Sequence, residues 1–371
     1  MKRLLIVMGT RPEVIKLAPV IREAKEGAAG SIEAGVLVTA QHRDILDHTL
    51  AVFGIAPDYD LNLMTEGQSI SAVCAGVLNG MEPILDKEGP DAVVVQGDTT
   101  TTFAAALAAC YKGVKVAHVE AGLRSWDRLN PYPEEVNRSL ISRISDFNFC
   151  PTERARENLL KENVDQKTIF VTGNTVVDAL NEALKIPREL DSGILGGFDP
   201  KADNIVLLTM HRRESFGSPM ERVFRSLREL VEGNRNIRIV FPVHPNPSVR
   251  RMAVAILKGV DGIRLIDPLP YLDFVNLMKL SKVIISDSGG VCEEAPSLGK
   301  PVLLIREVTE RPEALEAGTA VLVGTDPKKI IASVVRLVED EAEYGKFQNI
   351  KNPFGDGRAA ERIVKILMDR L

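Results

Sequence analysis

Short apolar runs that end at a glycine or polar turn, each followed by a helical pattern, recur along this chain. The clearest case is residues 283–305. There Val283–Ile285 ends at Asp287-Ser288-Gly289-Gly290, a helical segment follows, and Gly299-Lys300-Pro301 leads into another apolar run. A strand, a tight turn, a helix and a second strand in this order form the βαβ unit of a parallel sheet. The chain is therefore predicted to be an α/β protein.

The apolar runs fall into two groups, separated by a segment rich in Pro, Gly and Asp at residues 186–201. The strands expected before that segment are Leu4–Met8, Gly35–Thr39, Asp91–Val95, Val114–Val119, Phe147–Cys150 and Ile169–Val171. Those expected after it are Ile205–Met210, Ile237–Val243, Ile263–Ile266, Val283–Ile285, Val302–Ile305 and Val321–Val323. Two successive series predict two Rossmann-like domains, residues 1–172 and 173–357, with parallel sheets whose strand-end loops face a shared cleft. A final amphipathic helix is expected at Arg358–Leu371.

Composition argues against several classes of protein. A formal net charge of −5 without a basic tract is unlike a nucleic-acid-binding protein. The widely spaced Cys74, Cys110, Cys150 and Cys292 are expected to be reduced core thiols of a cytosolic protein. No apolar stretch approaches the roughly 20 residues that cross a bilayer, so no membrane association is expected. The chain has no G-x-G-x-x-G motif, P-loop or Cys/His metal spacing, so neither a cofactor nor a metal is expected.

The turn after Val283–Ile285 carries a hydroxyl and two glycines at the start of a helix. Backbone N–H groups and the positive end of the helix dipole point outward at such a place and can hold an anion. Glu293 and Glu294, one turn into the helix, could accept hydrogen bonds from a ribose while the turn holds its phosphates. The turn is therefore a candidate nucleotide site, although the same sequence also suits a tight turn that binds nothing.

Polar residues also follow the expected strands of the first half. Arg11 and Lys16 flank a helix start, where ligands bind in open α/β sheets, although both also suit solvated helix charges. Asp98 follows the third strand and either faces a ligand or caps the next helix. Glu120 follows the fourth strand, and Glu134 comes at the end of a long irregular segment of a kind that is often functional.

The second half adds His211 and Arg212 after its first strand and His244 after its second. A lone histidine is more often packed than catalytic, but His211 lies at a strand end beside two arginines. If these groups converge with the carboxylates, several acid/base groups would surround a cationic phosphate site.

Ten motifs, taken in order, resemble those of the non-hydrolysing UDP-N-acetylglucosamine 2-epimerases. They are GTRPE (Gly9–Glu13), TAQHR (Thr39–Arg43), GDTTTT (Gly97–Thr102), HVEAGLR (His118–Arg124), PEEVNR (Pro133–Arg138), TGNTVVDAL (Thr172–Leu180), HRRESFG (His211–Gly217), DSGGVCEEAPSLGKPVL (Asp287–Leu303), TERPEA (Thr309–Ala314) and NPFGDGRA (Asn352–Ala359). The resemblance thus covers the whole chain. It implies a GT-B-like fold, a C-terminal helix (358–371) that returns to the first domain, a homodimer, and interconversion of UDP-N-acetylglucosamine and UDP-N-acetylmannosamine without a cofactor.

The chemistry of that reaction matches the candidate residues. The C2 proton of the sugar is not beside a carbonyl, and an oxidative route would require a nicotinamide site for which no motif is present. Expulsion of UDP from C1 with loss of the C2 proton gives a 2-acetamidoglucal, and re-addition with protonation on the other face inverts C2. This route needs groups that hold the diphosphate, anionic stabilisation near C1, and acid/base groups on both faces of C2.

The resemblance assigns roles to matched positions. The catalytic residues would be Asp98, Glu120, Glu134 and His211, the last binding the diphosphate or assisting its departure. Substrate and UDP would bind at Arg11, Lys16, His211, Phe274, Ser288, Gly289, Gly290 and Glu294, with Phe274 facing uracil and Glu294 the ribose. Gln41, Arg212 and His244 match part of an allosteric site for UDP-N-acetylglucosamine that bacterial members have. Asp44 and Gly67 depart from the regulated members, and which carboxylate serves which face of C2 stays open.

Three other kinds of protein suit parts of this pattern. A hydrolysing relative would release UDP and N-acetylmannosamine after the same elimination, and the TAQHR segment favours the non-hydrolysing branch by resemblance. A GT-B glycosyltransferase shares the fold and the UDP site, but it needs an acceptor pocket and usually one base. A non-catalytic UDP-sugar sensor has no use for three carboxylates.

Overall fold

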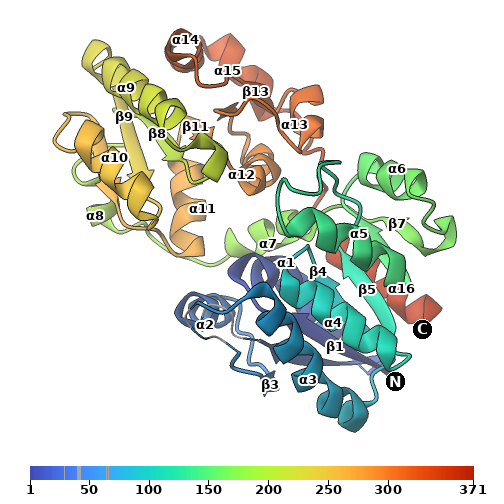
Figure 1. The fold of residues 1–371 in the computed structure, drawn as a ribbon. Helices are drawn as coiled ribbons and strands as arrows, with labels where there is room; N and C mark the ends of the chain where they lie inside the picture. The colour runs from blue at the N-terminus through green and yellow to red at the C-terminus, as the bar shows by residue number, and fades with distance from the viewer. Residues whose placement is uncertain (29, 40–42, 64, 66) are drawn as a thin grey trace. The chain divides into compact units, whose positions relative to one another are not determined.

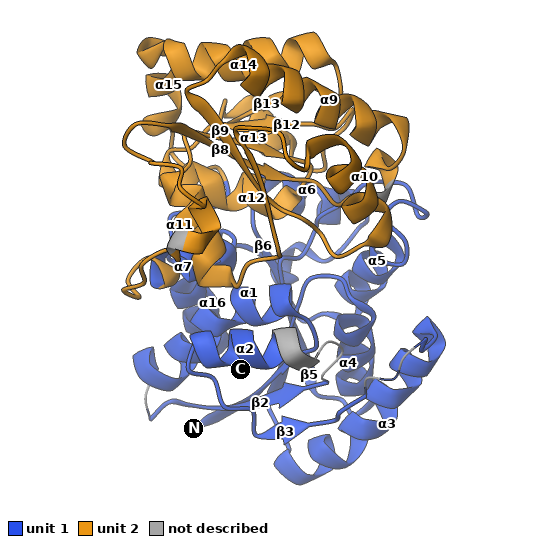
Figure 2. Cartoon of the chain, turned by 90° about the vertical axis from the view of Figure 1, so that its left-hand side faces the viewer, with its two compact units in different colours: residues 1–182, 354–371 blue, residues 183–353 orange. Residues whose placement is uncertain are grey.

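The computed structural model describes residues 1–28, 30–39, 43–63, 65 and 67–371 (Figure 1). These residues form two compact units, coloured separately in Figure 2. Unit 1 comprises Met1–Glu182 and Phe354–Leu371, and unit 2 comprises Ala183–Pro353. In the described part of the chain, no helix is both long and apolar enough to span a membrane.

Unit 1 is built on a parallel sheet covered by helices. Its strands are β1 (Lys2–Met8), β2 (Ile32–Val38), β3 (Tyr59–Asp60), β4 (Ala92–Gln96), β5 (Lys115–Val119), β6 (Phe147–Cys150) and β7 (Ile169–Val171). Its helices are α1 (Arg11–Arg22), the π-helical turn η1 (Glu23–Gly27), α2 (Arg43–Val52), α3 (Ile70–Glu88), α4 (Thr100–Tyr111), α5 (Glu134–Ile144), α6 (Glu153–Lys161), the 3₁₀ turn η2 (Gln166–Thr168), α7 (Thr175–Ala183) and α16 (Ala359–Arg370).

Unit 2 repeats the same construction with a smaller sheet. Its strands are β8 (Asn204–Thr209), β9 (Ile237–Pro242), β10 (Ile263–Ile266), β11 (Val283–Ser286), β12 (Val302–Leu304) and β13 (Ala320–Leu322). Its helices are α8 (Ser192–Leu195), α9 (Ser218–Gly233), α10 (Pro247–Leu257), α11 (Tyr271–Leu280), α12 (Gly289–Glu294), α13 (Pro312–Glu316), α14 (Pro327–Glu339) and α15 (Glu341–Gln348), with 3₁₀ turns η3 (Arg213–Ser215) and η4 (Ala295–Leu298).

The strand order of each sheet reverses at one point. The described strands of unit 1 run β3-β2-β1-β4-β5-β6-β7, and those of unit 2 run β10-β9-β8-β11-β12-β13, with every pairing parallel. The reversal lies between β1 and β4 in unit 1 and between β8 and β11 in unit 2. Ligands of open α/β sheets bind at the carboxyl ends of the strands beside such a switch point.

Every strand expected from the sequence is present. Phe147–Cys150, Ile169–Val171 and Ile263–Ile266 agree at both ends, and the other expected strands overlap the observed ones. The sequence did not indicate β3, because a two-residue edge strand is too short to show any alternation of apolar and polar residues. The expectation of core thiols is correct for Cys150 and Cys292, whereas Cys74 is half-buried and Cys110, near the end of α4, is exposed.

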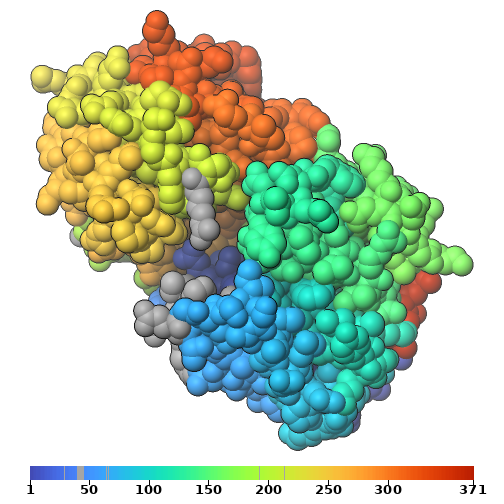
Figure 3. All heavy atoms as spheres, in the orientation of Figure 1, coloured from blue at the N-terminus to red at the C-terminus, as the bar shows by residue number. Residues whose placement is uncertain are grey.

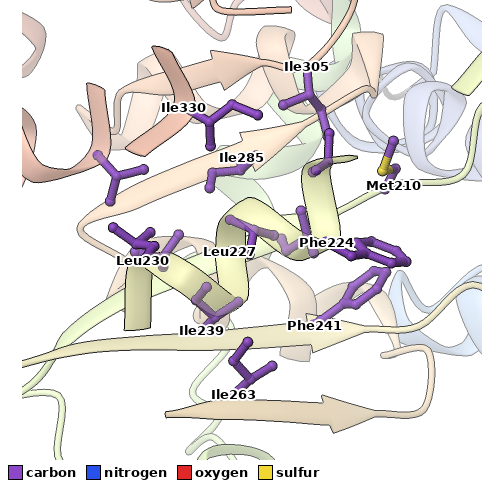
Figure 4. Close-up of a cluster of buried hydrophobic side chains, with 14 of the residues drawn as sticks. Met210, Phe224, Leu227, Leu230, Ile239, Phe241, Ile263, Ile285, Ile305 and Ile330 are labelled. Atoms are coloured by element: carbon purple, nitrogen blue, oxygen red, sulfur yellow. The ribbon is translucent and has the colours of Figure 1, made fainter. Parts of the chain in front are cut away.

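The core of unit 2 lies between its sheet and α9 (Figure 4). Phe224 of α9 packs on Phe241 of β9 with ring centroids 5.6 Å apart, and Leu227 and Leu230 continue the same apolar face. Each such fully buried side chain contributes about 1.5–3 kcal/mol. Met210, which follows β8, is buried in the same cluster, so apolar packing fixes the end of β8 from which the candidate His211 projects. On the outside of unit 2, α9 and α10 form the yellow surface in Figure 3.

Helix α16 packs on α1 within unit 1, where Val364 and Leu367 share one core cluster with Val14 and Leu17. Its first turn is capped by Asp178 of α7, which accepts hydrogen bonds from the N–H groups of Ala359 (3.2 Å) and Ala360 (2.9 Å). Burial raises the pKa of Asp178 to about 6. From the sequence, the domain boundaries were predicted after residues 172 and 357, which would put α7 in the C-terminal domain. The structure places α7 in unit 1 and divides the chain after residues 182 and 353, because α7 holds the returning helix.

At Gly122 the loop after β5 approaches the backbone of helix α6 closely, and a substitution can test this approach. Its φ of +88° favours glycine, and an added Cβ would lie 2.2 Å from the backbone oxygen of Ala155. We expect Gly122→Ala to lower the free energy of unfolding by about 3 kcal/mol or more, because left-handed strain adds to overpacking against backbone. Gly113→Ala is the matched control, since Gly113 has a φ of +70° and open space around it. It should cost about 1–2 kcal/mol. Equal losses in urea denaturation would contradict the close approach.

Candidate functional site

Several candidate residues of each unit lie in the loops at its switch point. In unit 1 the relevant loops follow β1 (Gly9-Thr10) and β4 (Gly97–Thr99), and in unit 2 they follow β8 (Met210–Arg212) and β11 (Asp287-Ser288). The carboxyl ends of neighbouring parallel strands lie at one sheet edge, so each pair of loops is adjacent. The two sets are described separately below.

A buried carboxylate that the sequence did not single out joins the two loops of unit 1. Glu13 accepts hydrogen bonds from the N–H groups of Gly9 (2.5 Å) and Thr10 (2.8 Å). It also accepts from the hydroxyls of Thr99 (2.5 Å) and Thr102 (3.0 Å) at the start of α4. Burial raises the pKa of Glu13, and these donors oppose the rise. Glu13 therefore serves the architecture, and it leaves the neighbouring Arg11, the exposed first residue of α1, at the sheet edge.

Lys16 and Glu120 form a buried ion pair at this edge. The ammonium of Lys16 donates to Glu120 Oε2, and Asn174 Nδ2 donates to the same oxygen at 2.9 Å. Their side chains are 12% and 6% exposed, so Lys16 is not the solvated helix charge that the sequence also allowed. Glu120 has a φ of +68°, a conformation that non-glycine residues rarely adopt and that often marks functional sites.

Asp98 does not cap α4, which was the alternative to a ligand-facing role. Thr99 is the cap, and its hydroxyl accepts from the N–H of Thr102 at 3.1 Å. The Asp98 carboxylate instead pairs with Arg138 Nε at 2.7 Å, and its backbone oxygen accepts from Asn137 Nδ2 at 2.8 Å. Two residues of α5 thus hold both the backbone and the side chain of Asp98.

Arg138 also connects Asp98 to the irregular loop before α5. Its Nη1 donates to Glu135 at 2.9 Å, and Glu135 accepts from the N–H groups of Ser125 and Trp126 at 3.0 Å. Glu135 is buried, whereas Glu134, the expected catalytic residue, is half-buried at the first position of α5. The loop is therefore held by Glu135, which in turn pairs with the same arginine that holds Asp98.

His118 of β5 stabilises the turn after β4, from which Asp98 projects. Its Nε2 lies 2.7 Å from the backbone oxygen of Gly97, so this nitrogen carries the proton and donates it. Burial lowers the pKa of His118 to about 4, and the ring is neutral at pH 7. A neutral donor in this place fixes the backbone from which Asp98 projects without adding charge.

In unit 2 the buried Asp287 joins the loops after β8 and β11. Its Oδ2 accepts from the N–H groups of His211 (2.9 Å) and Arg212 (2.8 Å), and its Oδ1 lies 3.3 Å from Nδ1 of His211. The ring of His211 stacks on that of His244, with centroids 5.7 Å apart and planes at 19°. Burial lowers the pKa of His211, and the charge of Arg212 acts in the same direction, against the carboxylate of Asp287.

Two arginines lie beside the candidate phosphate turn of Ser288, Gly289 and Gly290. A Cβ placed on Gly289 would lie 3.6 Å from the guanidinium carbon of Arg311 and 3.8 Å from Nη2 of Arg212. Ser288 precedes α12, and Gly289 and Gly290 are its first residues. Because no side chain occupies these positions, guanidinium groups and backbone can meet one anion there.

Two acids keep these arginines in place. Glu293 accepts from Arg311 Nε at 2.5 Å, and Glu310 lies 3.2 Å from Arg212 Nη2. Burial alone would raise the pKa of Glu310, but Arg212, Arg311 and Arg306 outweigh it and bring it to about 2. The idea that Glu293 could accept from a ribose is corrected, since it is 1% exposed and paired with Arg311. Arg311 belongs to the TERPEA motif, but the motif alone gave this arginine no predicted role.

Helix α11 contacts Glu294 through Tyr271 and also carries Phe274. Tyr271 donates its hydroxyl to Glu294 Oε1 at 2.8 Å, and Phe274 lies one helical turn further along, half-buried. Residues three apart share one face of a helix, so Phe274 and Tyr271 project from the same side of α11. A carboxylate on the helix that follows the phosphate turn, and an aromatic ring on the helix that contacts this carboxylate, suit a ribose and a base.

Gln41 lies outside the described residues, and Gly67 has a left-handed backbone with open space around it. Arg212 and His244, expected at an allosteric site, contact Glu310 and His211 respectively. Within the described ranges, no cluster of three or more His, Cys, Asp or Glu residues is arranged to hold a metal ion.

Comparison with known proteins places this arrangement in a family. Residues 25–368 match the family model described as UDP-N-acetylglucosamine 2-epimerase. The chain belongs to this family. It is 47% identical over 370 residues to the UDP-N-acetylglucosamine 2-epimerase of Salmonella typhimurium, covering 98% of each chain. It is 48% identical over 371 residues to that of Escherichia coli K12, again covering 98% of each chain.

Solved structures of the epimerase family share the fold. The enzyme of Neisseria meningitidis bound to UDP-GlcNAc matches with a TM-score of 0.92 at 44% identity, covering 99% of this chain and 100% of that one. The enzyme of Methanocaldococcus jannaschii, in complex with UDP-GlcNAc and UDP, matches with a TM-score of 0.81 at 38% identity, covering 99% of each chain. The glycosyltransferase of kitacinnamycin matches at 0.67 with 12% identity over 100% of this chain and 99% of that one, which concerns the fold alone. The expected GT-B-like class of two parallel-sheet α/β units is confirmed.

The pair formed by Arg138 and Glu135 should be strongly coupled in this family member. Their side chains are 9% and 4% exposed, so removing either residue takes a partner of opposite charge from a buried group. A double-mutant cycle with Arg138→Ala and Glu135→Ala should give a coupling energy of about 2 kcal/mol or more. The matched control is the exposed pair of Arg156 and Glu153, which has the same helical spacing and a separation of 3.3 Å. That pair should give about 0.3–0.5 kcal/mol. Similar coupling in both cycles would contradict the role given to Arg138.

Proposed function

We propose that this chain reversibly converts UDP-N-acetylglucosamine to UDP-N-acetylmannosamine. UDP leaves C1 as the C2 proton is removed from the opposite face, and a 2-acetamidoglucal forms. UDP then returns to C1 while a proton is added to the other face of C2. No outside oxidant or water enters, so atoms and electrons balance over the cycle.

The proposal rests on the different residue types at the two sheet edges, carboxylates in unit 1 and arginines beside a glycine turn in unit 2. Unit 1 presents Asp98 and Glu120 at the ends of adjacent strands, with Glu134 at the start of α5. Unit 2 presents the Ser288-Gly289-Gly290 turn, whose two glycines carry no side chain, beside Arg212 and Arg311. Carboxylates suit proton transfer at C2 and a cationic C1, while arginines and backbone N–H groups suit a departing diphosphate.

Roles follow from these positions. In unit 2, Ser288, Gly289, Gly290 and Arg311 would hold the diphosphate, Glu294 the ribose and Phe274 the uracil. In unit 1, Asp98, Glu120 and Glu134 would serve the two faces of C2 and the developing charge at C1, with Arg11 and Lys16 supplying positive charge. The complexes with UDP-GlcNAc reported for the relatives from N. meningitidis and M. jannaschii support this assignment of the substrate.

Solvent exchange at C2 tests the reaction. Incubation with UDP-N-acetylglucosamine alone in D₂O should place deuterium at C2, because the proton lost to a side chain is replaced from solvent. Asp98→Asn and Glu120→Gln should slow this exchange by about 10²–10⁴-fold, the usual contribution of a positioned acid or base, while UDP binding is largely retained. Asp86→Asn, which alters an exposed acid paired with Lys112, is the control and should exchange normally. Absence of exchange in the unmodified protein would overturn the proposal.

Product analysis in the same experiment tests the non-hydrolysing outcome. UDP-N-acetylmannosamine should accumulate to a constant ratio with UDP-N-acetylglucosamine. Free N-acetylmannosamine with stoichiometric UDP would identify the hydrolysing reaction instead. Exchange that requires a separate acceptor would indicate a glycosyltransferase.

A further inference from the structure

The two oxygens of the Asp287 carboxylate have different neighbours. Oδ2 accepts from the backbone N–H groups of His211 and Arg212 at 2.9 and 2.8 Å. Oδ1 is buried, has no hydrogen-bond partner among the described residues, and lies 3.3 Å from His211 Nδ1. A buried carboxylate oxygen without a donor is costly, so the nearby ring nitrogen is its natural partner. One oxygen therefore holds the backbone of the loop and the other faces the imidazole.

The plane of the His211 ring is set by His244. The two rings stack at 19°, and His244 Nδ1 accepts a hydrogen bond of 3.2 Å from the N–H of Asn246. His211 thus rests on the ring of His244, with its Nδ1 edge toward Asp287 and its Nε2 edge on the far side from that carboxylate.

Burial is the main reason that His211 is neutral at pH 7 before a ligand binds. Burial lowers its pKa, Arg212 and His244 act in the same direction, and Asp287 and Glu214 act against them. A neutral imidazole carries one proton, on either Nδ1 or Nε2. Beside a carboxylate acceptor that proton belongs on Nδ1, which leaves a lone pair on Nε2.

We propose that Asp287 is a positioning residue that keeps the proton of neutral His211 on Nδ1, so that Nε2 takes up a proton from solvent when a diphosphate binds. This inference rests on the proposed function, since the diphosphate is that of the UDP-sugar. The anion at the Gly289 turn adds negative charge near the ring, and the imidazolium then lies between Asp287 and the diphosphate. In serine proteases a buried aspartate likewise sets the tautomer of a histidine and stabilises its imidazolium.

Proton uptake makes UDP binding depend on pH. His211 is neutral above its lowered pKa in the free protein, and the bound anion raises that pKa. Between the pKa values of His211 in the free and in the bound protein, UDP binding draws a proton from solution. The Kd for UDP should therefore rise by up to about tenfold for each unit by which the pH increases. Below the pKa of His211 in the free protein the ring is already protonated, so the Kd for UDP should no longer depend on the titration of this ring.

Calorimetry of UDP binding tests the proposal. At about pH 8 the phosphates of UDP are already fully ionised, so proton uptake reports the protein. Titrations in two buffers of different ionisation enthalpy should show net proton uptake, of at most about one proton per UDP bound. The His211→Asn variant should bind UDP more weakly with almost no uptake. UDP binding by the unmodified protein without uptake would overturn this inference and leave the proposed function standing, whereas no UDP binding would overturn both.

Asp287→Asn separates positioning from folding. Its amide oxygen can still accept from the N–H groups of His211 and Arg212, while its NH₂ group faces Nδ1 and forces the proton of the ring to Nε2. Proton uptake should fall toward zero and kcat by about 10²–10⁴-fold, with a smaller change in KM. Asp203→Asn is the control, because Asp203 pairs with Arg238 at the other end of β8. It should keep uptake and kcat. Uptake in Asp287→Asn equal to that of the unmodified protein would contradict the proposal.

Discussion

A buried carboxylate joins the two diverging loops at the switch point of each sheet. Right-handed crossovers send the helices after β1 and β4 to opposite faces of the sheet, so the loops that start them separate and leave backbone N–H groups without sheet partners. Glu13 accepts from such groups in unit 1, and Asp287 does so in unit 2. Each acid belongs to one of the two loops, or to the helix that follows it, and accepts hydrogen bonds from the other loop or from the start of its helix. The edge where a ligand would bind is therefore shaped by internal polar contacts.

The acids at these sheet edges differ in what holds them. Glu13 and Glu135 both accept from backbone N–H groups, whereas the carboxylate of Asp98 pairs with Arg138 and that of Glu120 with Lys16. The sequence does not distinguish the two kinds, because Glu134 and Glu135 are identical neighbours. In the structure Glu135 is buried and pairs with Arg138 at 2.9 Å, whereas Glu134, the first residue of α5, is half-buried.

The strands and the switch-point loops were predictable, because buried parallel strands are continuous apolar runs and glycine or polar turns mark their ends. The partners of the site residues were not. Arg138 is 40 residues from Asp98 in sequence, and Lys16 is 104 residues from Glu120. Such pairs form only when the sheet brings distant loops together. Arg311 shows the same limit, since TERPEA is recognisable as a motif while its position beside Gly289 depends on tertiary packing. The assignment of α7 failed for a related reason, because its contact with α16 spans 181 residues.

Glu120 is the acid whose placement is hardest to explain as structural. A left-handed backbone at a non-glycine residue costs about 1–2 kcal/mol, and a glycine at this position would avoid that cost. The conformation is held from both sides, by the hydrogen bond of Gly97 N–H to Val119 and that of Ala121 N–H to Phe149, each 3.0 Å. Two residues later the chain does use glycine, at Gly122, where the backbone must approach α6. The chain thus has glycine where close packing demands it and a carboxylate where the strained backbone turns a side chain toward Lys16 and Asn174. Packing alone does not account for that choice, and a carboxylate required at the sheet edge does.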